Sequence, residues 1–288
     1  MKVGIQLYSV KQHAAKDGLG TLKEVAKLGY KYIEPYISML PRFSTGEGEK
    51  GYGLGMNRQD AKAFLDDTGI KIVGGHYYTG DFEAMCDYYA YLGAKNFGTG
   101  GYHFPGGLEE LMPKIDEMNK CAEIAKKYGM RYYYHNHFWE YQKFNGKTVM
   151  EIIAENTDPD IFFFEQDNYW AARGGVDPVE EMEKLKGRLI LMHQKDFARD
   201  AGEPINLFED KIDINKPITG EMHTKNRHVG TFAEVGNGIL PIQDYIDKGN
   251  ECGVEYVLLE QDLTAIDEIE SIKISMEAFH KFTGIEWD

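Results

Sequence analysis

The sequence predicts an α/β fold, a single-domain (β/α)8 TIM barrel, and three observations indicate it. Short runs rich in Val, Ile, Leu, Tyr and Phe alternate with segments whose apolar residues recur at helical spacing. Such alternation is typical of a parallel sheet with helices outside it. Eight repeats within 288 residues favour closure into a barrel, and glycine ends several helical segments, where a left-handed cap precedes the next strand. A doubly wound open sheet is the alternative.

Each predicted strand is almost continuously apolar, as expected for strands that are buried on both faces of a parallel sheet. In chain order, the strands are expected at residues 3–10, 30–36, 70–78, 94–100, 130–137, 161–169, 188–196 and 254–262. The clearest helical patterns lie between them, at residues 19–30, 57–70, 108–130 and 177–188. No linker divides the chain, so we expect one domain over residues 1–288.

One stretch, residues 197–234, interrupts this alternation because it is polar and shows no clear period. A loop of this length inside a compact domain is usually functional or mobile. We predict that it is an insertion after the seventh strand and that it lies over the barrel mouth.

Composition and missing motifs exclude several classes of partner and function. A formal net charge of −15 repels polyanions, so we expect no nucleic-acid partner. Three cysteines without CxxC spacing indicate a reducing compartment. The chain starts without a signal-peptide pattern and has no run long enough to span a bilayer, so we expect a cytoplasmic protein without a membrane partner. Sequence motifs for dinucleotides, NTP phosphates and serine nucleophiles are also missing.

Ionisable residues gather at the predicted strand ends, where barrels of this kind carry their active sites. They are Glu34, His76, His135, His137, Asp167, His193 and Glu260, with His103 just past the fourth strand. Histidine with Asp and Glu, without Cys, is a ligand set for a divalent ion such as Mn²⁺, Zn²⁺, Co²⁺ or Fe²⁺. The ion would polarise a carbonyl oxygen while a second carboxylate or imidazole moves a proton.

Structural roles stay open for several of these residues. A single histidine at a strand end is often a hydrogen-bonded core residue. For His103 and Glu34, a structural role and a functional role are equally expected. Phe138, Trp139 and Trp170 either line a sugar pocket or fill space. Surface or loop positions are expected for His13, His223, His228 and His280.

Several motifs, taken in order along the chain, resemble one known family. They are GIQLYSV, YIEPY, YHNHFWEY, EQDNYW, LMHQKD, EVGNGIL and VLLEQD. Their order is similar to that of the sugar phosphate isomerase/epimerase superfamily, the xylose isomerase-like TIM barrels that include inosose dehydratase and endonuclease IV. The likeness runs from about residue 1 to residue 285. Its most specific parts are YHNH with the following glutamate, and HxKD on the seventh strand.

The resemblance implies one divalent metal ion and a set of residues around it. Asp167, His193 and Glu260 match three of the family's ligands. Many members have glutamate at the position of His135, so either His135 is the fourth ligand, which we favour, or Glu140 reaches back to replace it. Glu140 is otherwise the leading acid/base candidate, and His137 is expected beside the substrate.

Substrate contacts are expected from Lys195, His76, Trp170 and Glu34. Lys195 matches the family's lysine after the seventh-strand histidine, which should meet a substrate oxygen. Trp170 stands where several relatives have a histidine, which argues against a three-metal phosphodiesterase site.

The implied function is a metal-dependent isomerase or epimerase that acts on a sugar, keto-sugar or cyclitol through an enediolate. A dehydratase, or a 3-keto-glycoside lyase or hydratase, would use the same intermediate. A sugar-binding barrel without turnover is the alternative from another class. The expected partner is a small molecule, and a homo-oligomer stays open. Phosphate on the substrate is unsupported, because the only basic residues noted near the proposed mouth are Lys195, Arg173 and Arg199.

Overall fold

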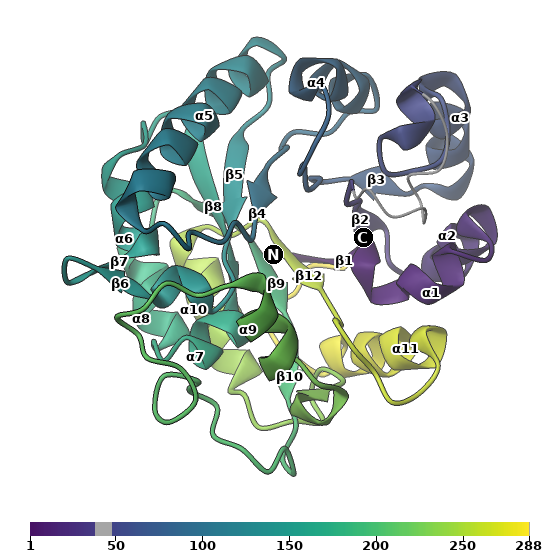
Figure 1. The fold of residues 1–288 in the computed structure, drawn as a ribbon. Helices are drawn as coiled ribbons and strands as arrows, with labels where there is room; N and C mark the ends of the chain where they lie inside the picture. Colours follow the sequence, from purple (N-terminus) through teal and green to yellow (C-terminus); the bar gives the residue numbers. More distant parts are fainter. Residues whose placement is uncertain (38–47, 288) are drawn as a thin grey trace.

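A parallel sheet forms the centre of the molecule, in a computed structural model that describes residues 1–37 and 48–287. The sheet has eight strands in the order β3-β2-β1-β12-β9-β8-β5-β4. Their bounds are β1 Lys2–Gln6, β2 Tyr32–Glu34, β3 Lys71–Ile72, β4 Thr99–Gly100, β5 Tyr132–His135, β8 Phe162–Asp167, β9 Leu189–Gln194 and β12 Tyr256–Leu259. Figure 1 shows the strands in the middle of the molecule with the helices around them.

The two edges of this sheet meet, so that the strands form a closed barrel. His76, just after β3, forms parallel bridges with Tyr36 on one side and with Gly98 on the other. The Tyr77 N–H donates to the Gly98 carbonyl at 2.7 Å, and the Gly98 N–H donates to the Gly75 carbonyl at 3.0 Å. The prediction of a (β/α)8 barrel is therefore confirmed over the doubly wound alternative.

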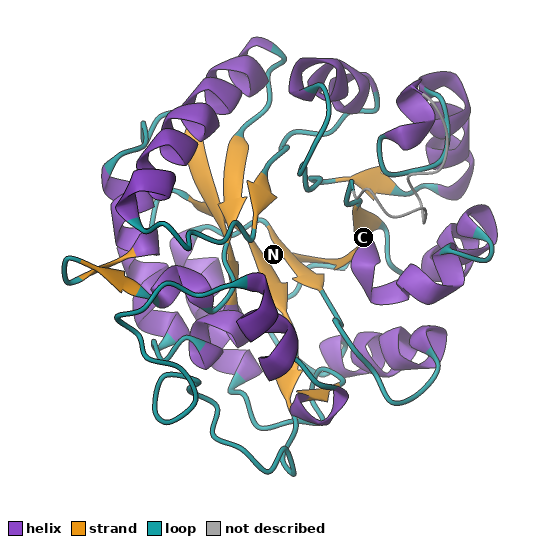
Figure 2. Ribbon diagram, viewed as in Figure 1, coloured by secondary structure: helices purple, strands orange, loops and turns teal. Residues whose placement is uncertain are grey.

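Helices follow the strands and cover the outside of the barrel (Figure 2). The main ones are α2 Gly18–Lys27, α3 Arg58–Thr68, α4 Phe82–Tyr91, α5 Leu108–Lys127, α6 Val149–Glu155, α7 Asn168–Arg173, α8 Pro178–Lys184, α10 Ile242–Cys252 and α11 Glu268–Phe279. Shorter pieces are α1 Lys11–Ala14, α9 Gly220–Asn226 and the 3-10 helices η1 Leu7–Val10, η2 Gly48–Gly51, η3 Trp139–Tyr141 and η4 Val229–Thr231. Glycine ends α3 and α10 in the left-handed conformation, with φ of 72° at Gly69 and 86° at Gly253, as the sequence predicted.

Seven of the eight predicted strands extend past the observed C-terminal end, and the first and sixth strands show a physical reason. The first turns into η1 after Gln6. The sixth ends at Asp167, because the side chain of that residue accepts a hydrogen bond from the Trp170 N–H at 2.8 Å and so caps α7. Apolar content does not show where a cap begins a helix, so the sequence did not place these ends.

Alternation along β5 sorts its side chains between the two faces of the barrel wall. Tyr132 faces outward and packs edge-on against Phe82 of α4, whereas Tyr133 faces inward and donates to Glu34. His135 is two residues further on and therefore also faces inward. The same alternation points Glu165 and Asp167 of β8 into the barrel.

A pair of short strands joins the two ends of the insertion where it leaves and rejoins the barrel. The strands β10 Asp196–Phe197 and β11 Phe232–Ala233 pair in antiparallel fashion. Between them, Leu207, Ile212 and Ile218 are buried in a cluster that also contains Phe138, Trp139, Tyr169 and Trp170. The segment thus packs on the residues that follow β5 and β8, and it carries α9. A second antiparallel pair, β6 Lys143–Phe144 with β7 Lys147–Thr148, follows η3.

Among the described residues, no helix is both long enough and apolar enough to span a bilayer.

Candidate metal centre

Four side chains meet at the C-terminal end of the barrel, three from β5, β8 and β9 and one from the residue directly after β12. His135, Asp167, His193 and Glu260 each offer one ligand atom, and these atoms all lie within 4.8 Å of one another. In the sheet, Asp167 lies beside His193 in register, and the Glu260 N–H donates to the Gln194 carbonyl at 3.2 Å. The Nδ1 atom of His193 lies 2.9 Å from Glu260 Oε2, and His135 Nε2 lies 4.0 Å from Asp167 Oδ2. The strand register thus brings together the four residues that the sequence singled out.

Burial distinguishes Glu260 from the other three members of this group. His135, Asp167 and His193 are at most 1% exposed, whereas Glu260 is 8% exposed. Burial would raise the pKa of Glu260, but Lys195 and His193 outweigh it and hold the pKa well below its usual value. Glu260 is therefore an ionised carboxylate at the rim of the site.

The ammonium group of Lys195 shows that these carboxylates favour a cation. It is buried between the carboxylates of Asp167 and Glu260, with Asp262 Oδ1 at 3.6 Å. Burial would lower the pKa of Lys195, yet the three carboxylates raise it above its ordinary value. Burial raises the pKa of Asp167 to about 6, although Lys195 opposes the rise. Two imidazole nitrogens and two carboxylates in such a group fit a divalent ion of the N/O-binding class.

Glu140 lies away from this group and has its own partners. Its Oε1 accepts a hydrogen bond from the Tyr134 hydroxyl at 2.7 Å, and its Oε2 accepts one from the His137 N–H at 2.8 Å. Burial raises its pKa to about 8 despite these hydrogen bonds. Of the two fifth-strand alternatives, the geometry therefore favours His135 as the donor. The catalytic assignment of Glu140 stays a prediction.

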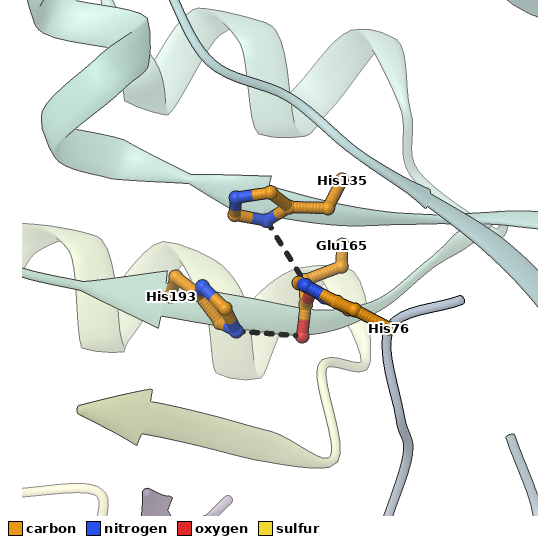
Figure 3. Close-up of side chains that lie close together, drawn as sticks. All are labelled: His76, His135, Glu165 and His193. Carbon is orange, nitrogen blue, oxygen red and sulfur yellow. Dashed lines mark hydrogen bonds and ion pairs between the residues drawn. The ribbon is translucent and has the colours of Figure 1, made fainter. Parts of the chain in front are cut away.

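A second layer of buried polar groups lies beneath the first. Figure 3 shows His76, His135 and His193 around the carboxylate of Glu165, and these four form a second group with ligand atoms within 4.8 Å. Glu165 Oε2 lies 2.7 Å from His76 Nε2. Glu165 was not among the residues predicted from the sequence. It stands two residues before Asp167, and strand alternation points the two side chains the same way.

Glu34 belongs to this lower layer too, instead of the barrel mouth. Its oxygens accept hydrogen bonds from Gln6 Nε2 at 2.8 Å and from the Tyr133 hydroxyl, and His193 Nε2 lies 2.7 Å away. Glu34 is fully buried and His76 is 3% exposed. The Glu34 oxygens and His76 Nε2 face other side chains of the barrel interior, and the expected substrate contacts of both residues stay a prediction.

Histidine and tryptophan rings form one side of the mouth. His137 stacks on Trp139 with ring centres 4.2 Å apart and an angle of 9°, and His103 stacks on the same indole at 4.2 Å and 21°. His223, on α9, lies 4.5 Å from Trp139 and 5.7 Å from Trp170. His223 was expected at the surface or in a loop, but the folded insertion brings it against the barrel.

The three histidine rings are uncharged, and each of them, like Trp170, has a buried nitrogen without a hydrogen-bond partner among the described residues. Burial lowers the pKa of His103 and His137, and it lowers that of His223 to about 3. The buried atoms His103 Nε2, His137 Nδ1, His223 Nε2 and Trp170 Nε1 find no hydrogen-bond partner in the described part of the chain. We call His103, His137, Trp139, Trp170 and His223 the imidazole side.

The opposite side of the mouth is ionic. Arg227 Nη1 lies 3.7 Å from Asp262 Oδ2, and the Lys11 ammonium donates to the Asp262 carbonyl. We call Lys195, Glu260, Asp262, Lys11 and Arg227 the charged side. Further out, Arg173 Nη2 donates to Glu203 Oε1 at 2.6 Å.

Comparison with known proteins gives the family and independent support for the fold. A profile of the xylose isomerase-like TIM barrel family matches residues 22–262. An inosose dehydratase from Clostridium beijerinckii is 24% identical over 209 residues, which are 69% of this chain and 60% of that protein. Another from Geobacillus kaustophilus is 28% identical over 116 residues, 38% of this chain and 34% of that protein. The matched segments thus span about a third to three fifths of these relatives.

Solved structures are similar over almost the whole chain. A sugar phosphate isomerase/epimerase from Parabacteroides distasonis has a TM-score of 0.75 at 23% identity, covering 99% of this chain and 95% of that one. The IOLI protein with a bound zinc atom has a TM-score of 0.69 at 16% identity, covering 98% and 99%. Likeness at these identities shows the fold alone. Because the family profile spans most of the sequence, and the motif order agrees with it, the chain belongs to the xylose isomerase-like TIM barrel family.

Proposed function

We propose that this protein is a divalent-metal-dependent enzyme that moves a proton at the carbon next to a carbonyl group of an uncharged sugar or cyclitol, as an isomerase or epimerase. The observation that carries this proposal is the group of His135, Asp167, His193 and Glu260 at the barrel mouth. These four residues would hold the ion through two nitrogen and two oxygen donors. When bound, the ion supplies Lewis acidity that polarises the carbonyl and stabilises the negative charge left by proton removal.

Two side chains are placed to exchange the proton. Glu260 is ionised and is the most exposed member of the donor group, so we assign it as the group that accepts the proton. His137 is neutral, and its Nδ1 has no hydrogen-bond partner among the described residues. It follows β5, whereas Glu260 follows β12, and β8 and β9 lie between these two strands in the sheet. Groups on opposite sides of one substrate can remove and return a proton on different faces or carbons.

Glu140 fits a supporting role better than the predicted role of base. Both of its oxygens accept hydrogen bonds inside the protein, one of them from the His137 N–H. The raised pKa of Glu140, about 8, keeps it largely protonated at neutral pH. We therefore propose that it holds the backbone of His137 in place.

The two sides of the mouth favour a substrate without phosphate. On the charged side, Lys195 and Arg227 each face a carboxylate, and so does Arg173 further out. The imidazole side offers uncharged nitrogens and ring faces, which suit hydroxyl groups and the apolar face of a sugar or cyclitol ring. Lys195, Arg227 and Arg173 are thus already paired with carboxylates, and the Lys11 ammonium donates to backbone carbonyls, which disfavours a phosphate group.

Dehydration is the second candidate, and the sequence relatives favour it. Curated relatives of this chain include inosose dehydratases from Clostridium beijerinckii and Geobacillus kaustophilus. Loss of a hydroxyl group from the neighbouring carbon would follow the same proton removal. Only the fate of the intermediate separates the two reactions.

Proton exchange tests the proposal directly. The protein, loaded in turn with Mn²⁺, Co²⁺ or Zn²⁺, is incubated in D2O with an inosose or with D-tagatose, and proton NMR follows the hydrogen next to the carbonyl. We expect exchange that EDTA stops and added metal restores. Deuterium in an isomer or epimer identifies the main proposal, whereas deuterium together with an unsaturated ketone identifies the dehydratase. Sugar binding without exchange or conversion would contradict both and favour a binding protein without turnover.

A further inference from the structure

Each of the two histidines in the donor group presents one nitrogen to that group and the other to the layer beneath. His193 has Nδ1 2.9 Å from Glu260 and Nε2 3.2 Å from Glu165 Oε1. His135 has Nε2 directed toward Asp167, at 4.0 Å, and Nδ1 3.3 Å from Glu165 Oε2. One carboxylate therefore lies under both rings (Figure 3).

Two atoms at this junction lack the hydrogen bonds that buried polar atoms normally make. His135 Nδ1 and Glu165 Oε1 are both buried, and neither has a hydrogen-bond partner within the described ranges. Glu165 itself is fully buried. His135 Nδ1 lies 3.3 Å from Glu165 Oε2, and Glu165 Oε1 lies 3.2 Å from His193 Nε2, so the carboxylate is within reach of both rings.

The surroundings hold the Glu165 carboxylate at this point. His76 Nε2 contacts Glu165 Oε2 at 2.7 Å from the side of β3. Glu34 lies 2.7 Å from His193 Nε2 and so shares the underside of that ring. A histidine that binds a metal through one nitrogen usually donates its other N–H to a carboxylate, which fixes the ring and makes it a better ligand.

We infer that Glu165 is a positioning residue for the metal centre: it accepts the Nδ1–H of His135 and lies as a negative charge beneath His193. This inference rests on the proposed function, because it takes the upper group as the place of the ion. It adds a residue that determines how tightly and in which orientation the two histidines bind.

Metal affinity measured without any substrate tests this inference. In titrations with Co²⁺ or Zn²⁺, Glu165→Gln should weaken binding by about 10- to 100-fold relative to the unchanged protein. Glu181→Gln is the matched control, since Glu181 is also a buried glutamate, 3% exposed, but lies on α8 with Lys184 as its partner. The control should bind the ion as the unchanged protein does. Equal affinity in all three proteins would overturn the inference.

A second measurement avoids the risk that Glu165→Gln fails to fold. In the zinc-loaded natural protein, nitrogen-15 NMR of the histidine rings should show His135 with its proton on Nδ1. A proton on Nε2 would place the ion in the lower group with Glu165 as a ligand, and the inference would fail. If the natural protein binds no divalent ion at all, the proposed function fails; if it binds but Glu165→Gln binds equally, only this inference does.

Discussion

The two sides of the barrel mouth use polar groups in opposite ways. On the charged side, Lys195, Glu260 and Asp262 are packed together as buried ions, and Lys195 also contacts Asp167 of the donor group. On the imidazole side, His103, His137 and His223 are neutral and stack around Trp139. The first side satisfies its charges within the protein, whereas the second leaves buried nitrogens unused.

The two sides of the mouth are therefore suited to different tasks, metal binding and substrate binding. Buried carboxylates that already surround an ammonium group are suited to a cation, and they gain little from a neutral sugar. Unused neutral donors and acceptors next to ring faces are suited to hydroxyl groups, because buried polar atoms without partners are costly until a ligand pairs with them. Changes on the charged side should therefore alter metal binding, and changes on the imidazole side should alter substrate binding.

The largest effect is expected for Asp167→Asn. The substitution removes one of the two negative donors but keeps an oxygen that can cap α7, since asparagine caps helices as well as aspartate does. We expect metal affinity to fall by more than about 100-fold while the fold survives, as measured by calorimetric titration and circular dichroism. Asp177→Asn is the control, because Asp177 caps α8 in the same way. Full metal occupancy in Asp167→Asn would refute the assignment.

Counted per pH unit, a smaller effect is expected from pH alone. In the protein without metal, burial would lower the pKa of His193, but Glu165, Glu260 and Glu34 raise it well above its usual value; that of Asp167 is about 6. An ion must displace the protons held by these groups, so affinity should fall as the pH is lowered from 8 to 5. Each displaced proton weakens binding by about tenfold per pH unit below its pKa. A flat profile of Kd against pH would show that these groups are not ligands.

An effect of about tenfold is expected on the imidazole side. His223→Phe keeps a ring against Trp139 but removes the nitrogen, and one lost hydrogen bond costs up to about 1.4 kcal/mol, which is about tenfold in affinity. We expect KM for the substrate found by proton exchange to rise about tenfold while the metal Kd stays unchanged. His228→Phe is the control, since His228 lies on the same insertion but is exposed, 3.2 Å from Glu203. A change in metal affinity in His223→Phe would contradict the proposal that the imidazole side binds only the substrate.

The smallest effect on metal and substrate is expected for Glu140→Gln. The amide oxygen can accept from the His137 N–H, and the amide NH2 can donate to the Tyr134 hydroxyl oxygen, which then accepts instead of donating. Both contacts are therefore kept, and kcat and metal Kd should change by less than about threefold. Loss of activity with metal retained would restore Glu140 as the base, and loss of metal would make it a ligand.

The same variant should change how stability depends on pH. Burial raises the pKa of Glu140 from 4.5 to about 8, so between these values the folded protein binds more protons than the unfolded chain. Its free energy of unfolding therefore falls as the pH rises through this window, by on the order of a few kcal/mol from this residue. Denaturant unfolding at pH 5 and pH 9 should show that Glu140→Gln loses most of this slope.

The fold and the meeting of four ionisable residues at one rim could be predicted because each leaves a local signal. Strands buried on both faces read as apolar runs, and the carboxyl ends of parallel strands must meet at one rim. Ionisable residues such as His193 and Glu260 at those ends are therefore neighbours in any closed barrel. Their convergence follows from topology and needs no knowledge of the side-chain packing.

The sequence contains weaker signals for the buried polar layer around Glu165 and for the packing of the insertion. Glu165 stands inside an apolar run, and only its even spacing from Asp167 indicates that it faces the barrel interior. The polar insertion has no period, so nothing local shows that Leu207 and Ile218 are buried or that His223 reaches Trp139. Such contacts depend on how a long segment folds back, which tertiary packing decides.

The paired strands β10 and β11 also bear on how this protein could change over time. Because the insertion leaves and returns through one narrow neck, at Phe197 and Phe232, it can be replaced as a unit while the barrel stays intact. A new substrate preference would then need the rewriting of one continuous stretch of gene. A new metal preference would need matched changes on four separate strands, so the chemistry is expected to be inherited far more faithfully than the choice of molecule.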